Sequence, residues 1–129
     1  MQRFKTRPQF QAALAGGLVA KSAHFALHRV ELDAQANTPS SAVFSVTDIW
    51  MGAMVPKRWA KRAVTRNAIK RQIYTVSTSL QHDFPRAAFL FRLRREFSRQ
   101  DYPSASSPAL RQAVRTELLA LMQAIKVAA

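Results

Sequence analysis

Fifteen consecutive residues carry seven basic side chains and no acidic one, and this segment limits the fold more than any other feature. The basic residues are Lys57, Arg58, Lys61, Arg62, Arg66, Lys70 and Arg71. From Lys61 to about Leu80 the chain has no Pro or Gly, and apolar residues recur at helical spacing, which predicts a helix. At about 100° per residue, the apolar and cationic side chains fall in separate arcs. We therefore expect a helix that packs on one side and meets an anion on the other.

Each arc of this helix has a few defining residues. The apolar arc holds Ile69, Ile73 and Val76, with Leu80 at the same spacing, and the cationic arc holds Arg66, Asn67, Lys70 and Arg71. Positive side chains at a helix N-terminus oppose the helix dipole, and a bound phosphate would remove that conflict. The alternative is a solvated basic face or an import-signal-like cluster. A solvated face usually interleaves acids, and this one has none.

The charge of the whole chain supports an anionic partner. Its 129 residues include 20 Lys and Arg against 7 Asp and Glu, a formal charge of +13. Self-repulsion of that size destabilises a small domain unless a polyanion neutralises it, so nucleic acid is the first partner to consider. Hydrophobic residues make up 48% of the chain, enough for one core, and we expect a single domain over residues 1–129 rather than a disordered tail.

Several classes of protein are disfavoured. The absence of Cys excludes disulfides, thiolate zinc sites and cysteine nucleophiles. Basic residues precede a short apolar run from Ala12 to Ala20, as in a secretory signal, but Gly16 and Gly17 interrupt that run. No stretch approaches the roughly 20 apolar residues of a membrane span. We expect a cytoplasmic protein with no membrane partner.

The remaining pattern predicts one mixed sheet with helices packed on it, an α+β fold. The expected elements are a helix at about 8–15, a strand at His24–Leu32, one or two strands over Ala42–Thr47 and Ile49–Val55, a strand at Ala87–Arg94, and a last helix beginning at Pro108. Asp33–Ser41 and Phe97–Pro108 are expected to be a loop and a linker. Ser107 is the expected cap of the last helix, whose apolar stripe is Leu110, Val114, Leu118, Leu121 and Ile125. Because the two longer helices cannot bury both sheet faces fully, we expect an exposed face or cleft.

Candidate catalytic groups are sparse. His24 and His28 fall on one face of the expected strand, and ordinary surface or cleft histidines are favoured over a metal pair. The aspartates Asp33, Asp48, Asp83 and Asp101 show no paired-carboxylate spacing for two-metal hydrolysis. Any catalysis must therefore come from a partner.

Two further features leave their interpretation open. Arg92, Arg94, Arg95 and Arg99 form a second basic cluster, which is either a solvated sheet edge or an RNA contact. Trp50 is expected in the core, whereas the role of Trp59 is open.

The basic segment resembles the signature helix of the protein subunit of bacterial ribonuclease P. In that family a paired-basic strand end precedes a helix with Arg-Asn-Arg and Lys-Arg. Here Lys57-Arg58 and Lys61-Arg62 precede Ala-Val-Thr-Arg-Asn-Ala-Ile-Lys-Arg at residues 63–71. The opening Arg3-Phe4-Lys5 with Phe10, the strand Phe25-Ala26-Leu27-His28 and the run Met51-Gly52-Ala53-Met54-Val55 extend the similarity over most of the chain.

The resemblance implies a fold and a function. It implies an α/β sandwich with a left-handed βαβ crossover, in which the protein assists a catalytic RNA that removes the 5′ leader from precursor tRNA. The protein itself would bind no cofactor, supply no catalytic residue and take no small-molecule substrate, while the RNA-containing holoenzyme requires magnesium. The residues implied to bind the RNA subunit are Lys61, Arg62, Arg66, Asn67, Lys70 and Arg71. Those implied at the leader cleft are Phe10, Leu14, His28, Lys57 and Arg58, and a charged His28 is expected to tighten leader binding at lower pH.

The sequence departs from the family pattern at three positions. Ala68 replaces the second Arg of Arg-Asn-Arg, and Leu14 and His28 stand where the family often has cleft aromatics. A structural or ribosomal RNA-binding protein without a role in tRNA processing is the alternative that basicity alone supports equally. A protein with nuclease activity of its own is a third, less favoured class.

Overall fold

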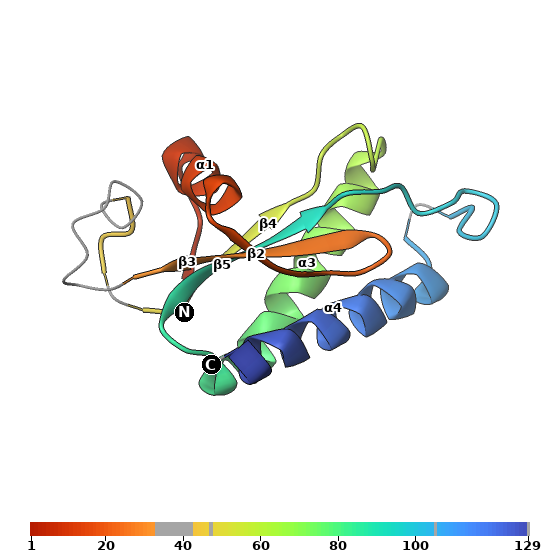
Figure 1. Ribbon diagram of the computed structural model, residues 1–129. Helices are drawn as coiled ribbons and strands as arrows, with labels where there is room; N and C mark the ends of the chain where they lie inside the picture. The colour runs from red at the N-terminus through yellow and green to blue at the C-terminus, as the bar shows by residue number, and fades with distance from the viewer. Residues whose placement is uncertain (33–42, 47, 105, 129) are drawn as a thin grey trace.

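The computed structural model describes residues 1–32, 43–46, 48–104 and 106–128 (Figure 1). Five strands form one mixed sheet in the order β1-β4-β5-β3-β2. Their bounds are β1 Gln2–Arg3, β2 Gly17–Lys21, β3 Phe25–Glu31, β4 Trp50–Met54 and β5 Ala87–Leu93. β4 is parallel to β1 and β5, whereas β3 is antiparallel to β5 and β2. The predicted α+β class is confirmed.

The helices lie on both faces of the sheet. They are α1 Arg7–Ala15, α3 Ala63–Leu80 and α4 Pro108–Ala128, and the short 3-10 helix η1 Gln81–Asp83 follows α3. Figure 1 shows α1 on one face and α3 and α4 on the other. β4, α3 and β5 form a parallel βαβ unit, as the resemblance implies, and the left hand of its crossover stays a prediction. None of the described helices is long and apolar enough to cross a membrane.

β5 carries an almost unbroken apolar run because both of its faces are covered. Phe89 and Phe91 are fully buried in the larger core, which β5 shares with α3 and α4. Ala88 and Leu90 point the opposite way, into a second core under α1. The chain therefore has two apolar layers separated by one sheet.

The last helix forms as the sequence predicts. Pro108 is its first residue, and the Ser107 hydroxyl accepts a hydrogen bond of 3.0 Å from the backbone N–H of Leu110. All five residues of the predicted stripe, from Leu110 to Ile125, are buried. α4 thus covers the larger core with the predicted face.

The strand predicted over Ala42–Thr47 is wrong for the residues that the structure describes. Residues 43–46 form a turn and bends, while positions 42 and 47 and the predicted loop Asp33–Ser41 lie outside the described residues. Phe44 is buried against Phe4 and Trp50, with ring centroids 5.2 and 5.3 Å apart respectively. Apolar residues in this run therefore anchor a loop. The expectation that Trp50 lies in the core is confirmed.

Other element boundaries also differ from the prediction. No pattern in the sequence predicts β1, which has two residues. The sequence also does not predict β2, because Gly16 and Gly17 indicate only a helix end. α3 begins at Ala63 rather than Lys61, since Arg62 has extended backbone angles (φ −86°, ψ 132°). His24 lies just before β3, not inside the strand.

Gly52 allows Phe4 to close the core under α1. A Cβ atom at Gly52 would stand 2.5–2.9 Å from three ring atoms of Phe4, which is itself buried. We predict that Gly52→Ala lowers the free energy of unfolding by about 1–3 kcal/mol, because the ring must move. Gly17→Ala is the matched control, since no atom lies within 4 Å of its added Cβ. Urea unfolding of both variants measures the difference, and equal effects would contradict this account of Gly52.

Candidate nucleic-acid interface

A tight turn connects β4 to α3 and exposes the first cations of the basic segment. The carbonyl of Pro56 accepts hydrogen bonds from the backbone N–H groups of Trp59 (3.0 Å) and Ala60 (3.1 Å). Lys57 and Arg58 are exposed, and the Arg58 guanidinium lies 5.1 Å from the ring centre of Trp59. Trp59, whose role the sequence left open, is half-buried and supports this arginine through a cation–π contact.

The predicted division of α3 into two arcs is confirmed. Ile69, Ile73 and Val76 are buried in the larger core. Of the predicted cationic arc, Asn67, Lys70 and Arg71 are exposed and Arg66 is half-buried. Lys61, just before the helix, is also exposed. The first turn of α3 has no acidic residue, and the N-cap Arg62 makes no side-chain capping bond. This end of α3 therefore combines the positive end of the helix dipole with cationic side chains.

Two of the predicted RNA-binding arginines also hold the backbone of their surroundings. Arg66 Nη1 donates to the carbonyl oxygens of Ala60 (3.0 Å) and Lys61 (2.9 Å). Arg62 Nη2 donates to the carbonyl of Pro103, 3.3 Å away. A guanidinium has five N–H donors, so each side chain keeps donors for a ligand. These bonds fix where the two cations point.

The second basic cluster has separate structural roles for its members. Arg94 donates to the carbonyl of Ser22 through Nε (3.1 Å) and Nη2 (2.6 Å), so it fastens the β2–β3 hairpin. Arg92 Nε donates to His28 Nε2 at 3.3 Å, and Arg95 and Arg99 are exposed. The interpretation of this cluster as a solvated sheet edge is wrong. β5 lies between β4 and β3, so it is not an edge strand of the sheet.

Of the five predicted leader residues, Phe10 and Leu14 lie on α1 and His28 on the strand β3, whereas Lys57 and Arg58 lie in the turn after β4. Phe10 is half-buried, with its ring edge-on to Phe4 at 5.2 Å, so it contributes to the core under α1. Leu14 is 41% exposed and Leu18, opposite His28 in the β2–β3 pair, is 51% exposed. Leu18 gave no signal in the sequence because β2 was not predicted.

His28 is buried, which contradicts its expected role as a charged group. Burial lowers the pKa of His28 below its ordinary value, and the positive charge of Arg92 lowers that pKa further. The ring accepts the Arg92 hydrogen bond through Nε2, which requires the unprotonated nitrogen. Burial, the charge of Arg92 and this hydrogen bond therefore all favour the neutral form of the His28 ring over the charged form.

The other histidine of the expected strand belongs to a different site. His24 Nδ1 lies 2.6 Å from Glu117 Oε2 on α4, and its ring stacks on Phe97 with centroids 3.8 Å apart. Glu117 Oε1 accepts from Ser22 Oγ (2.6 Å) and from the backbone N–H of His24 (2.8 Å). His24 thus ties the hairpin to α4, away from His28. Within the described ranges, no group of three or more His, Asp or Glu side chains is arranged to hold a metal.

Four acidic side chains are paired outside the basic segment. Besides Glu117, Asp48 lies 3.7 Å from the N-terminal ammonium, Glu31 lies 2.5 Å from Arg29 Nε, and Asp83 lies 3.7 Å from His82. Among the ion pairs of the described residues, none includes a member of the segment 57–71. The cations around the start of α3 therefore have no acidic partner in the part of the chain that is described.

Comparison with known proteins gives the family. The family described as Ribonuclease P matches residues 1–119. This chain belongs to that family. The Ribonuclease P protein component of Trichormus variabilis is 36% identical over 95 residues, which are 67% of this chain and 66% of that protein. The match thus spans slightly less than two thirds of that relative.

Two further comparisons support the family and its fold. The Ribonuclease P protein component of Ralstonia pickettii is 31% identical over 121 residues, covering 94% of this chain and 76% of that protein. The structure of the Staphylococcus aureus RNase P protein superposes with a TM-score of 0.66 at 17% identity, covering 95% of this chain and 94% of that one. The family's fold is therefore shared even where few residues are identical.

The buried His28 predicts a pH dependence of stability. Because its pKa is lower in the folded chain than in the unfolded chain, the unfolded state takes up the proton first as the pH falls. The free energy of unfolding should therefore decrease as the pH falls through about 6.5 towards the lower folded pKa. His28→Gln keeps a hydrogen-bond acceptor for Arg92 and should remove this part of the pH dependence, and Arg92→Gln should reduce it. Urea unfolding from about pH 7.5 to about pH 5.5 measures the effect. Identical pH profiles for parent and His28→Gln would refute it.

Proposed function

We propose that this chain is the protein component of ribonuclease P, and that it binds the RNA subunit through the exposed cationic arc of α3. One observation carries the proposal. At the start of α3, exposed cations surround a helix N-terminus that has no side-chain cap, and none of these cations forms an ion pair with an acidic residue in the described part of the chain. RNA phosphates supply that counter-charge, and backbone N–H groups at a helix N-terminus favour the same ligand.

The six predicted RNA-binding residues divide into two roles within this proposal. Asn67, Lys70 and Arg71 are exposed and make direct contacts to the RNA, as does Lys61. Arg66 and Arg62 are half-buried and hold the turn and the segment beyond β5 while they offer their remaining donors to the RNA. Ala68 leaves one guanidinium fewer on this face than the family pattern has, which lowers the number of phosphate contacts.

The second part of the proposal concerns the 5′ leader of precursor tRNA. Leu14 offers exposed apolar surface at the end of α1, Phe10 offers the uncovered part of its ring, and Lys57 and Arg58 supply positive charge after β4. Apolar contact together with electrostatic attraction is enough to hold a single strand without base-specific recognition. His28 would act here as a neutral hydrogen-bonding group.

In this proposal the RNA subunit and its magnesium ions carry out phosphodiester cleavage. The protein contributes binding energy and reduces the repulsion between RNA subunit and substrate, because its cations neutralise phosphates of both. A structural RNA-binding protein is the alternative class. It would bind RNA with similar salt dependence but would not distinguish precursor from mature tRNA.

Reconstitution tests the proposed function directly. The purified chain alone should leave precursor tRNA intact, and adding a bacterial ribonuclease P RNA should restore cleavage at magnesium concentrations where that RNA alone is slow. The physical reason is charge neutralisation by the cationic arc, so Lys70→Ala with Arg71→Ala should weaken the stimulation. Cleavage by the chain after all RNA is removed would contradict the proposal, and so would an absence of stimulation.

Leu14 gives the sharper test of the leader site, because Phe10 also packs against Phe4. We expect Leu14→Ala to change stability by less than about 0.5 kcal/mol, as is usual for exposed positions. It should weaken the affinity of the reconstituted enzyme for precursor tRNA about fivefold, equivalent to roughly 1 kcal/mol of apolar burial. Affinity for mature tRNA should not change. Leu119→Ala is the matched control, since Leu119 is a 36% exposed leucine on α4. Equal losses for both tRNAs would remove Leu14 from the leader site.

A further inference from the structure

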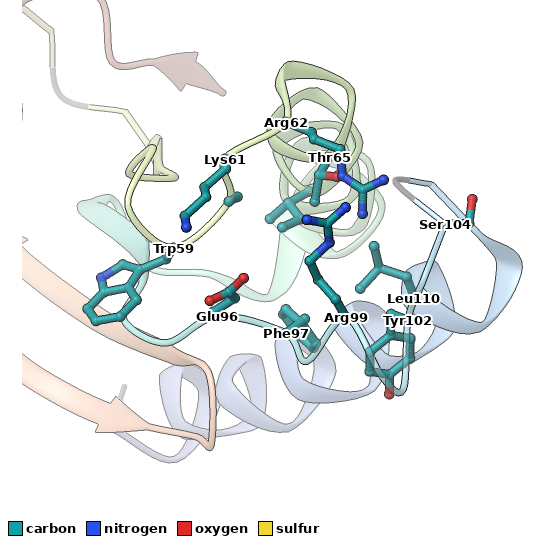
Figure 2. Close-up of a pocket in the computed structure, with 12 residues that line it drawn as sticks. Trp59, Lys61, Arg62, Thr65, Glu96, Phe97, Arg99, Tyr102, Ser104 and Leu110 are labelled. Atoms are coloured by element: carbon teal, nitrogen blue, oxygen red, sulfur yellow. The ribbon is translucent and has the colours of Figure 1, made fainter.

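A pocket lies between the start of α3 and the segment that follows β5 (Figure 2). Its floor is apolar and includes the buried side chains of Ile69, Phe97 and Leu110. Its cavity volume is about 50 Å³, several times what one water molecule requires. Small-molecule sites are commonly larger than roughly 300 Å³, so this space suits a group of a few heavy atoms.

Two arginines from different parts of the chain converge on this pocket. Figure 2 shows the guanidinium groups of Arg62 and Arg99 pointing toward one another, and both residues line the cavity. Arg62 donates one hydrogen bond, to Pro103. Within the described residues Arg99 has neither a hydrogen bond nor an ion pair. Two cations directed at one space repel each other unless an anion lies between them.

The pocket itself holds little negative charge to relieve this repulsion. Glu96 is its one acidic lining residue, and no ion pair joins Glu96 to either arginine in the described part of the chain. Lys61 adds a third cation to the lining. Guanidinium groups bind phosphate oxygens with paired, charge-assisted hydrogen bonds. A phosphate group is small enough for this cavity and carries the negative charge that would offset its cations.

The segment that carries Arg99 is held against the pocket by its own contacts. The backbone N–H of Tyr102 donates to the Ser98 carbonyl at 2.8 Å, and the Tyr102 ring packs edge-on against Phe97 with centroids 5.7 Å apart. The Arg62–Pro103 bond joins the same segment to the start of α3. Arg99 therefore extends from an anchored loop, so less side-chain and backbone freedom is lost when it binds a ligand.

We propose that the pocket between Arg62 and Arg99 binds one phosphate group, and that this phosphate belongs to the backbone of the RNA subunit. The first half stands on the pocket alone, and the second rests on the proposed function. A phosphate bound in this pocket extends the RNA-binding surface from α3 onto the segment after β5. It also gives Arg99 a role that the sequence left open.

The test compares Arg99→Gln with Arg95→Gln in binding to a bacterial ribonuclease P RNA at several salt concentrations. Arg95 is the matched control, because it is exposed, loses the same charge and does not line the pocket. Removing one phosphate contact should flatten the plot of log affinity against log salt by about 0.7–0.9. We expect this change, with about a 3- to 10-fold loss of affinity at moderate salt, for Arg99→Gln only, which is the scale of one typical net hydrogen bond in water.

A second arm uses inorganic phosphate and the protein alone. Phosphate should raise the melting temperatures of the parent and of Arg95→Gln, because a ligand stabilises the state that binds it. The increase for Arg99→Gln should be smaller. Phosphate stabilisation that depends on Arg99, combined with an unchanged salt slope for RNA, would overturn the assignment to RNA. Identical behaviour of the two variants in both arms would overturn the pocket.

Lys70→Ala separates failure of the pocket from failure of the proposed function. If Lys70→Ala weakens binding to the RNA subunit while Arg99→Gln does not, the cationic arc of α3 stands and the pocket falls. If the parent binds the RNA subunit no better than an unrelated RNA, the proposed function fails, and the phosphate arm alone then decides whether the pocket binds an anion.

Discussion

Burial of β5 on both faces requires a helical layer on each side of the sheet, and the positions of the cationic side chains follow from how those layers pack. Phe89 and Phe91 face α3 and α4, and each fully buried aromatic of this size contributes roughly 1.5–3 kcal/mol. Like-charge pairs on a helix surface cost only about 0.2–0.5 kcal/mol each. Apolar packing therefore sets the rotation of α3 about its axis, and the cationic arc faces outward as a result.

The same comparison explains how a chain of formal charge +13 remains compact. The two apolar layers lie on opposite faces of the sheet, and the central strand β5 contributes side chains to both. Nearly every residue of β5 therefore stabilises one layer or the other. The residual electrostatic strain is concentrated where α3 begins, since the acids of the described ion pairs lie in other elements. A polyanion that binds there removes repulsion without disturbing either apolar layer.

Periodic features could be predicted from the sequence, whereas features that depend on tertiary contacts could not. The spacing of Ile69, Ile73 and Val76 determined both the helix and its exposed arc, because the helical period alone decides which side chains share a face.

The run around Phe44 looked like a strand because apolar spacing cannot distinguish a strand from a loop with an anchoring ring. The backbone contacts of Arg66 and Arg94 could not be predicted, since the carbonyls that these arginines bind come from folded segments. His28 looked exposed because Arg92, its neighbour across the sheet, is 64 residues away in sequence.

The absence of acid from the first turn of α3 has a kinetic consequence for any polyanionic partner. At physiological ionic strength a surface charge is felt over about 8 Å, so several unpaired cations on one helix end give a field that acts before contact. The acids of the described ion pairs, such as Glu117 with His24, lie in other elements, and nearby Glu96 is a single carboxylate among several cations. A nucleic acid diffusing toward this protein is thus turned toward the α3 end during approach, and encounters there begin in a productive orientation.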